Sequence, residues 1–227
     1  YGDFSGYSDI AIGIALLLGF RFPANFDQPY RALSLQDIWR RWHISLSSWL
    51  RDDLYIGLGG SRRGRARTMR NLLATMVLGG LWHGAGWTFV LWGALHGVGL
   101  VVERLVWPEP NATVGGRLGR AVRGLATFHI VCVGWVFFRS VDLERAFQVF
   151  GALSGSWTSA PRLSLGVALL LLAGVATQLT TPGRVDHWWE RASELPVVVQ
   201  AIGITAAILT FDVLGPTGVA PFLYFAF

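Results

Sequence analysis

The sequence predicts an all-helical, polytopic integral membrane protein. Of its 227 residues, 52% are hydrophobic and only 15% are charged, whereas about 25% are charged in an ordinary soluble domain. Apolar runs of helical length alternate with short polar segments, as spans and loops do in a membrane. All 19 basic residues are arginines, and they lie between the apolar runs. This interleaving fits the positive-inside pattern, so we expect membrane lipid and no nucleic acid as a partner.

The first element is a short apolar run that ends at residue 20. It follows a polar and aromatic opening that contains Asp3 and Asp9, which we place at the membrane edge because unpaired carboxylates are costly inside. A span needs about 20 apolar residues, so we expect sequence upstream of Tyr1 to complete it. Residues 21–31 contain two prolines and form a loop.

Residues 34–49 are expected to form one amphipathic helix at an interface or beside a polar cavity. Ser34 is suited to cap its N-terminus, with Asp37 three residues on. Arg40 and Ser47 fall on the polar side, and His43 lies on the border between the two faces. The apolar stripe comprises Leu35, Ile38, Trp39, Trp42, Leu46 and Trp49.

A dense basic loop follows the amphipathic segment. It holds Arg62, Arg63, Arg65 and Arg67, and it is expected to keep this loop in the cytoplasm. Arginine also pairs well with phosphate, so the same four side chains are candidates for binding an anionic, nucleotide-like donor. A second basic stretch comprises Arg117, Arg120 and Arg123, with Arg104 upstream.

If both basic stretches are cytoplasmic, residues 71–103 enter the membrane and return as a hairpin. Its turn is the sequence LWHGAGW at residues 81–87. The first limb, residues 71–82, makes about 18 Å of helix against a hydrocarbon core of about 30 Å. We therefore expect His83 inside the bilayer, where an imidazole is costly unless it faces a cavity or a partner. The glycines around it permit non-helical backbone and close approach.

Further spans are expected at residues 88–106, 121–138, 163–179 and 197–214. Residues 146–157 have an amphipathic pattern, residues 182–191 are expected to form a loop, and the aromatic tail 215–227 to lie at an interface. Cys132 lies in an apolar run and is expected to be an inert thiol. No repeat or linker interrupts the pattern, so residues 1–227 are expected to belong to a single membrane domain.

Among the histidines, His83 is the leading candidate for a chemical role, and His43 is the second. His96 and His129 are expected to be hydrogen-bonded packing residues, and His187 an interfacial anchor. No pair has the spacing of a zinc site. Haem held between helices by two histidines, and a non-enzymatic transport module built on the broken hairpin, are the alternatives that stay open.

The sequence contains no nucleophile elbow and no phosphate-cradling loop. His83 is therefore interpreted as a general base that acts on a hydroxyl supplied by the substrate. A hydroxyl, a base and an anionic activated donor together describe acyl transfer.

An ordered set of motifs resembles the bacterial membrane-bound O-acyltransferase family, in particular its alginate O-acetyltransferase branch. The resemblance covers residues 1–100, weakens through the middle of the chain and returns at the tail. The chain therefore looks like the C-terminal half of such an enzyme. The motifs are DFSGYSD at 3–9, GFRFP at 19–23, WRRWHISLS at 39–47, LYI at 54–56 with GG at 59–60, LWHGA at 81–85, and APFLYF at 220–225.

The resemblance implies short and re-entrant helices around a thin, funnelled centre in the bacterial inner membrane. It implies that His83 is the catalytic residue and His43 a second functional histidine. It also implies acetyl-CoA as the donor on the cytoplasmic side, with no bound cofactor, and an acceptor reached from the periplasm. Relatives work with a separate periplasmic acetyltransferase. The acceptor could be alginate, peptidoglycan, cellulose or another exported polysaccharide.

Overall fold

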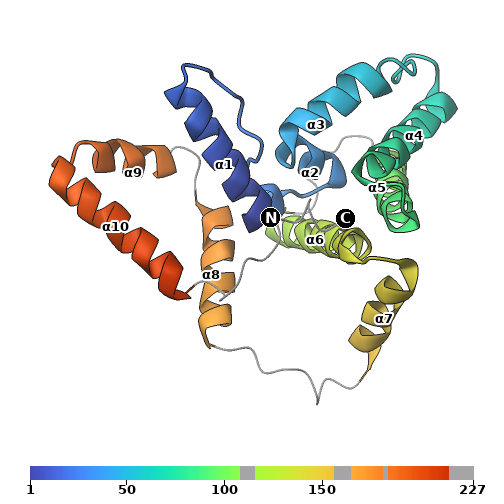
Figure 1. Ribbon diagram of the computed structural model, residues 1–227. Coiled ribbons are helices and arrows are strands. Elements are labelled where there is room, and N and C mark those ends of the chain that lie inside the picture. The colour runs from blue at the N-terminus through green and yellow to red at the C-terminus, as the bar shows by residue number, and fades with distance from the viewer. Residues whose placement is uncertain (108–115, 156–164, 181–183, 215–227) are drawn as a thin grey trace. The chain divides into compact units, whose positions relative to one another are not determined.

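The computed structural model describes residues 1–107, 116–155, 165–180 and 184–214, and every regular element in these ranges is a helix (Figure 1). The all-helical prediction is thus confirmed for this part of the chain. Contacts divide the chain into two units, residues 1–168 and 169–227, with the boundary inside α8. The single membrane domain stays a prediction. The helices of the second unit are α8 (Leu165–Leu179), α9 (Arg184–Ser193) and α10 (Val197–Leu214).

The first unit is built on a hairpin of α4 (Arg65–His83) and α5 (Trp87–Val106), which lie side by side (Figure 1). Glycines let the two backbones approach: a Cβ added at Gly80 would lie 2.3 Å from the carbonyl oxygen of Phe89, and one at Gly93 would lie 2.3 Å from that of Met76. The predicted helical hairpin is confirmed, with its turn at residues 84–86 inside the expected 81–87. Its entry into a membrane stays a prediction.

Helix α4 begins at Arg65, six residues before the predicted limb. Arginine is a good helix former, so the end of the basic loop continues into the helix. The 19 residues of α4 make about 28 Å of helix, compared with about 18 Å for the limb expected from the sequence. The depth of His83 in a bilayer stays a prediction.

The predicted continuous helix over residues 34–49 is wrong, because the chain forms α2 (Leu35–Arg41) and α3 (Ile44–Trp49) with a break between them. The predicted cap is correct: Ser34 Oγ accepts a hydrogen bond from the backbone N–H of Asp37 at 3.0 Å. At the break His43 adopts φ 45° and ψ 56°, a left-handed conformation that few residues other than glycine adopt. A π-helical turn, η2 (Leu50–Tyr55), continues from α3.

The loop before α2 causes this break by bonding the backbone on both sides of it. The carbonyl oxygen of Asn25 accepts from the N–H of Ile44 at 3.0 Å, and the N–H of Asp27 donates to the carbonyl of Arg41 at 2.9 Å. Backbone groups that a continuous helix would pair internally therefore find partners outside it. Only the folded loop supplies those partners, so the local pattern could not reveal the break.

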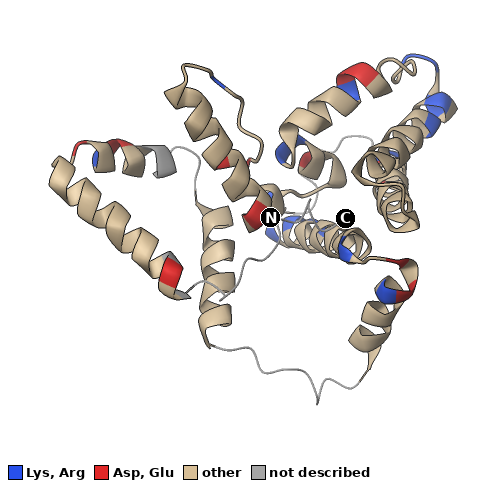
Figure 2. Ribbon diagram, in the orientation of Figure 1, with Lys and Arg blue, Asp and Glu red and all other residues tan. Residues whose placement is uncertain are grey.

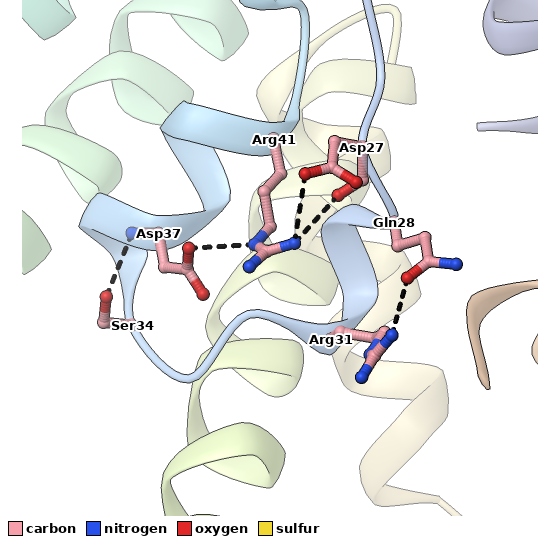
Figure 3. Close-up of polar contacts among 6 residues, drawn as sticks. All are labelled: Asp27, Gln28, Arg31, Ser34, Asp37 and Arg41. Atoms are coloured by element: carbon pink, nitrogen blue, oxygen red, sulfur yellow. Dashed lines mark hydrogen bonds and ion pairs between the residues drawn. The ribbon is translucent and has the colours of Figure 1, made fainter. Parts of the chain in front are cut away.

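Arg41 fastens the same loop through its side chain (Figure 3). Its guanidinium bonds Asp37 Oδ1 at 2.8 Å and reaches Asp27 at 3.4 Å to Oδ2 and 3.2 Å to the carbonyl oxygen. Further along, Arg31 Nη1 donates to Gln28 Oε1 at 2.7 Å, next to the short 3₁₀ helix η1 (Pro29–Arg31). The loop is thereby held against α2.

Aromatic contacts join the end of α2 to the start of α1 (Gly2–Leu17) and to α6 (Gly116–Arg139). The ring of Trp42, which follows α2, lies 5.9 Å from Tyr1, which precedes α1, and 4.7 Å from Trp135 of α6, measured between ring centroids. Glu103 of α5 accepts from the N–H of Leu35 at 2.8 Å, which ties the start of α2 to α5. The core beneath them comprises Ala32, Leu35, Ile38 and Val131.

Within the described residues, α5 and α6 are long and apolar enough to cross a membrane, while the apolar helices at residues 165–179 and 197–210 are shorter. The amphipathic segment near residue 146 forms α7 (Leu143–Ser154). The expected loop at residues 182–191 is wrong, because α9 occupies most of it. Prolines at 182 and 196 bound that segment and leave a proline-free stretch free to form a helix. The tail 215–227 lies outside the described residues.

Candidate active site

His83 ends α4 and packs among aromatic rings from three helices. Its ring centroid lies 4.9 Å from that of Phe138 of α6, 5.2 Å from Trp92 and 6.3 Å from Phe89, both of α5, and 5.0 Å from its neighbour Trp82. The four rings define what we call the aromatic enclosure: Trp82, Phe89, Trp92 and Phe138.

The turn after His83 needs glycine. A Cβ at Gly84 would lie 2.6 Å from a ring carbon of Phe89, so no larger residue fits without moving that ring. Phe89 is buried and also contacts Phe138 at 5.2 Å between ring centroids. The small residues of the motif thus allow an α5 ring to pack close to the end of α4.

His43 lies at the break between α2 and α3, in different surroundings. Its Nδ1 is 3.3 Å from Asn25 Oδ1 and 3.3 Å from Ser45 Oγ. The Phe4 ring lies edge-on at 4.8 Å. Burial lowers the pKa of His43 to about 4, so its ring is uncharged at neutral pH. A neutral imidazole can accept a proton at one nitrogen while it donates from the other.

The fold brings His43 and His83 together although 40 positions separate them in the sequence. The Trp82 ring contacts both: its centroid lies 6.4 Å from that of His43 and 5.0 Å from that of His83. The two site histidines expected from the sequence are therefore neighbours, while their chemical roles stay predictions.

A cavity of about 340 Å³ lies between the segment from α2 to η2 and the α4–α5 hairpin, and neither His43 nor His83 is among its lining residues. Three buried polar atoms in its lining have no partner among the described residues, namely Trp39 Nε1, Tyr55 Oη and Thr75 Oγ1. The Trp39 ring contacts Trp92 at 5.7 Å, and Trp92 belongs to the aromatic enclosure of His83. The lining of the cavity also includes three arginines, Arg40, Arg51 and Arg104.

These three arginines give the cavity a positive rim on a partly apolar wall, which suits an anionic ligand with an apolar part. Arg51 is also paired with Asp52 at 2.7 Å, whereas no carboxylate of the described residues pairs with Arg40 or Arg104. The sequence predicts Arg40 on the polar face of its helix, but its spacing does not indicate that Arg40 and Arg104 of α5 line the same cavity.

The four predicted donor-binding arginines, by contrast, are exposed and do not line this cavity. Arg62 and Arg63 lie in the turn before α4, and Arg65 and Arg67 lie in its first turn. Figure 2 shows the ribbon coloured for basic residues at this end of α4. Their contact with a donor stays a prediction.

The other three histidines each have surroundings of their own. His96 is buried against Trp39 and Trp92, with ring centroids 5.4 and 5.0 Å away, so its predicted packing role fits. Its Nδ1 has no hydrogen-bond partner among the described residues, so the hydrogen bond expected there is not found at that atom. His129 is exposed and its Nδ1 lies 2.7 Å from the carbonyl oxygen of Leu125. His187 is paired with Glu190 at 3.9 Å. In the parts of the chain that are described, no three histidine, cysteine or acidic side chains gather to hold a metal.

Asn25 is the site residue that the sequence analysis missed. Asn25 belongs to the proline-containing loop at residues 21–31, and its separation of 18 residues from His43 in the sequence carries no periodic signal. Cys132 of α6 is a partly buried free thiol, and its inertness stays a prediction.

Comparison with known proteins gives relatives for most of the chain. The family model of the membrane-bound O-acyltransferases matches residues 1–109. A probable alginate O-acetylase of Pseudomonas putida is 40% identical over all of this chain and 51% of its own length. That of Azotobacter vinelandii is 50% identical over 77% of this chain and 36% of its own length. A peptidoglycan O-acetyltransferase of Helicobacter pylori is 46% identical over 68% and 29%, respectively. The chain spans about half the length, or less, of these relatives.

Proposed function

The chain belongs to the membrane-bound O-acyltransferase family, and from that membership we propose that it carries the histidine centre of an O-acetyltransferase acting on an exported polysaccharide. The relatives named above support this class of reaction, since two are named for alginate and one for peptidoglycan acetylation. The observation that carries the proposal is the placement of His83 in the aromatic enclosure, with His43 next to it across Trp82.

In the proposed reaction His83 is the general base. As the acceptor hydroxyl oxygen attacks the carbonyl carbon of the acetyl thioester, the hydroxyl proton passes to the imidazole of His83. The new C–O ester bond forms, the C–S bond breaks, and the proton is delivered to the departing thiolate. The ring ends the cycle as it began. His43 assists by binding or orienting one of the two substrates.

The donor is proposed to be acetyl-CoA, which approaches from the cytoplasmic side. The cavity lined by Trp39 supports this route, because it combines an apolar wall with Arg40 and Arg104, and phosphate pairs well with guanidinium. Trp39 contacts Trp92, which in turn contacts His83. The exposed turn that carries Arg62 and Arg63 is the second candidate for the donor's phosphates. The acceptor, or a periplasmic partner enzyme that passes the acetyl group on, is proposed to approach from the other side of the inner membrane.

Two arginine variants separate the candidate donor sites. We expect Arg40→Gln to raise the donor KM by about tenfold, the cost of losing one charge-assisted hydrogen bond of roughly 1.5 kcal/mol, with little change in kcat. Arg62→Gln serves as the matched control, since it removes the same charge from the exposed turn. A raised KM in Arg62→Gln alone would assign the phosphates to the turn and remove the cavity from the donor route.

The function itself is tested in the full-length protein that contains this chain. Transfer of labelled acetyl from acetyl-CoA to polysaccharide is measured in membranes for wild type, His83→Ala and His129→Gln. His129 supplies the matched control because its ring is exposed on α6 and is bonded to the backbone. We expect transfer to vanish in His83→Ala and to persist in His129→Gln. Unchanged transfer in a folded His83→Ala protein would remove His83 from the mechanism, and a transport module would retain substrate passage in that variant.

A further inference from the structure

We propose that Asn25 is a positioning residue that holds the ring of His43 with its proton on Nδ1, so that Nε2 carries the lone pair. The inference rests on the proposed function in one respect only, namely the use to which that lone pair is put. The hydrogen-bond geometry that assigns the proton is independent of any activity.

The first step is the orientation of the Asn25 amide. The backbone N–H of Ser45 donates to Asn25 at 3.2 Å. A backbone N–H can only donate, so the Asn25 atom that faces it is the oxygen and not the nitrogen. The Asn25 Nδ2 group points the other way and donates to Ser8 Oγ at 3.3 Å. Both contacts agree, so the amide is not interchangeable with its flipped form.

The second step assigns the proton of His43. Asn25 Oδ1 carries no hydrogen, and His43 Nδ1 lies 3.3 Å from it. A hydrogen bond therefore forms only if Nδ1 is the protonated nitrogen. Ser45 Oγ also lies 3.3 Å from Nδ1 and gives its own hydrogen to Asn25 Oδ1 at 3.0 Å. The hydroxyl can then only accept from Nδ1, and both neighbours select the same tautomer.

The third step gives the state of the other nitrogen. Burial lowers the pKa of His43 to about 4, so the ring is neutral and holds one proton. With that proton on Nδ1, the Nε2 atom on the opposite edge is an acceptor. Free imidazole side chains in water favour the opposite tautomer, so the Asn25 and Ser45 contacts select a form that the ring does not prefer by itself.

The backbone around His43 explains why the arrangement persists. Asn25 bonds Ile44 through its own carbonyl oxygen, and Asp27 bonds Arg41 through its N–H. His43 is thus clamped on both sides in its left-handed conformation, a costly backbone state that surrounding contacts must hold in place. These clamps use backbone atoms of residues 25 and 27, so changing the Asn25 side chain leaves them intact.

As an acceptor, Nε2 of His43 takes a hydrogen bond from a hydroxyl or from a protonated His83 and cannot donate one. His43 is therefore suited to orient the acceptor hydroxyl or to receive a proton, and not to stabilise an oxyanion. This makes the proposed reaction more specific, because the sequence does not distinguish a His43 that accepts a hydrogen bond from one that donates it.

The test reads the tautomer directly by nitrogen-15 NMR of the full-length protein labelled at histidine, with the His43 signals assigned from their loss in His43→Gln. We expect the wild type to show a protonated Nδ1 and a bare Nε2. Asn25→Leu removes the acceptor at similar volume and should yield a mixture with protonated Nε2. Asn25→Asp keeps the acceptor and should retain the wild-type pattern. Ser8→Ala, which removes only the contact of Nδ2, is the matched control and should also retain it.

The kinetic readout separates positioning from folding. Loss of a residue that orients a functional side chain lowers activity about 10- to 100-fold. We expect Asn25→Leu to lower kcat in that range with a less than about twofold change in the donor KM, and Asn25→Asp to restore most of kcat.

The outcomes distinguish the two proposals. A wild-type spectrum with protonated Nε2 overturns the inference even if Asn25→Leu fails to fold. Equal kcat in wild type and Asn25→Leu overturns the positioning role. Retained acetyl transfer in His83→Ala, alongside the expected wild-type spectrum, overturns the proposed function and leaves the tautomer assignment standing.

Discussion

The surroundings of the two histidines differ in kind. His83 is packed among four aromatic rings that come from α4, α5 and α6. His43 is held by directed hydrogen bonds to Asn25 and Ser45. Packing restricts where a ring lies, while hydrogen bonds also decide which nitrogen carries the proton. The comparison shows that aromatic side chains surround the ring of His83, whereas hydrogen bonds to Asn25 and Ser45 assign the proton of His43. We expect this difference between a general base and the residue that assists it.

The largest expected effects come from replacing the two histidines, singly and together. We expect His83→Gln to lower kcat/KM by about 10³-fold and His43→Gln by about 10- to 100-fold, in the range for general bases and orienting groups. Since both are proposed to act on one transferred proton, the double variant should be no slower than His83→Gln alone.

The measurement is steady-state acetyl transfer by the three variants of the full-length protein. His187→Gln, a change at an exposed histidine, controls for general damage. If the losses in the double variant are strictly multiplicative, the two rings act independently. That result would contradict the proposal that His43 assists His83 in one step.

The next effect concerns the hairpin that supports the aromatic enclosure. Gly93→Ala puts a methyl group 2.3 Å from the carbonyl oxygen of Met76, so α4 and α5 must separate. Overpacking of this kind costs about 1 to 3 kcal/mol, and we expect a clear fall in the thermal unfolding midpoint in detergent.

Gly203→Ala in α10 is the matched control. Within its own unit, no described atom lies within 4 Å of the added methyl group, and alanine is a better helix former by about 1 kcal/mol. We expect no loss of stability there. Equal destabilisation by both changes would contradict the close packing of α4 on α5.

A smaller effect compares the ring contacts of the two histidines. Phe138→Leu removes a buried ring 4.9 Å from His83, and Phe4→Leu removes a partly buried ring 4.8 Å from His43. Because His43 keeps its hydrogen bonds, we expect Phe138→Leu to lower kcat the more, with about 1 to 2 kcal/mol of lost stability from the unfilled volume. Acetyl transfer and thermal unfolding of both variants check this, and a greater loss of kcat in Phe4→Leu would contradict it.

The smallest effect is the pH dependence of stability from His43, which lies outside α5 and α6. Its folded pKa of about 4 is below the ordinary value of 6.5, so the unfolded chain binds the proton more tightly. The contribution to stability is therefore present above pH 6.5 and lost as the pH falls from 6.5 towards 4.

We expect the unfolding midpoint of the wild type to fall more between pH 7.5 and pH 5 than that of His43→Gln. His187→Gln should follow the wild type, because that side chain is exposed. An identical pH dependence in wild type and His43→Gln would show that the ring is already protonated or accessible to water.

Local patterns predicted much of the framework. The cap at Ser34, the α4–α5 hairpin and the apolar helices each follow from neighbouring residues, and the structure has them near the expected positions. The failures have a common cause. The break at His43 depends on a loop 18 residues earlier, and the helix at residues 184–193 was obscured by its charged composition.

The site was predicted in part. His83 and His43 were singled out from a costly intramembrane position and from a resemblance, and the fold places them on either side of Trp82. Asn25 and Arg104 were not found, because nothing in their immediate sequence marks them. Each becomes a candidate site residue only because the fold brings it near a residue on another element.

By itself the sequence determined that the chain is helical and strongly apolar, and that two histidines stand out, because helix period, caps and composition are properties of neighbours along the chain. The tertiary structure alone decided that a helix stops at His43, which nitrogen of that ring bears the proton, and that arginines from α2 and α5 line one cavity. Those outcomes depend on hydrogen-bond partners and packing surfaces far away in the sequence, which take up their positions only when the chain has folded.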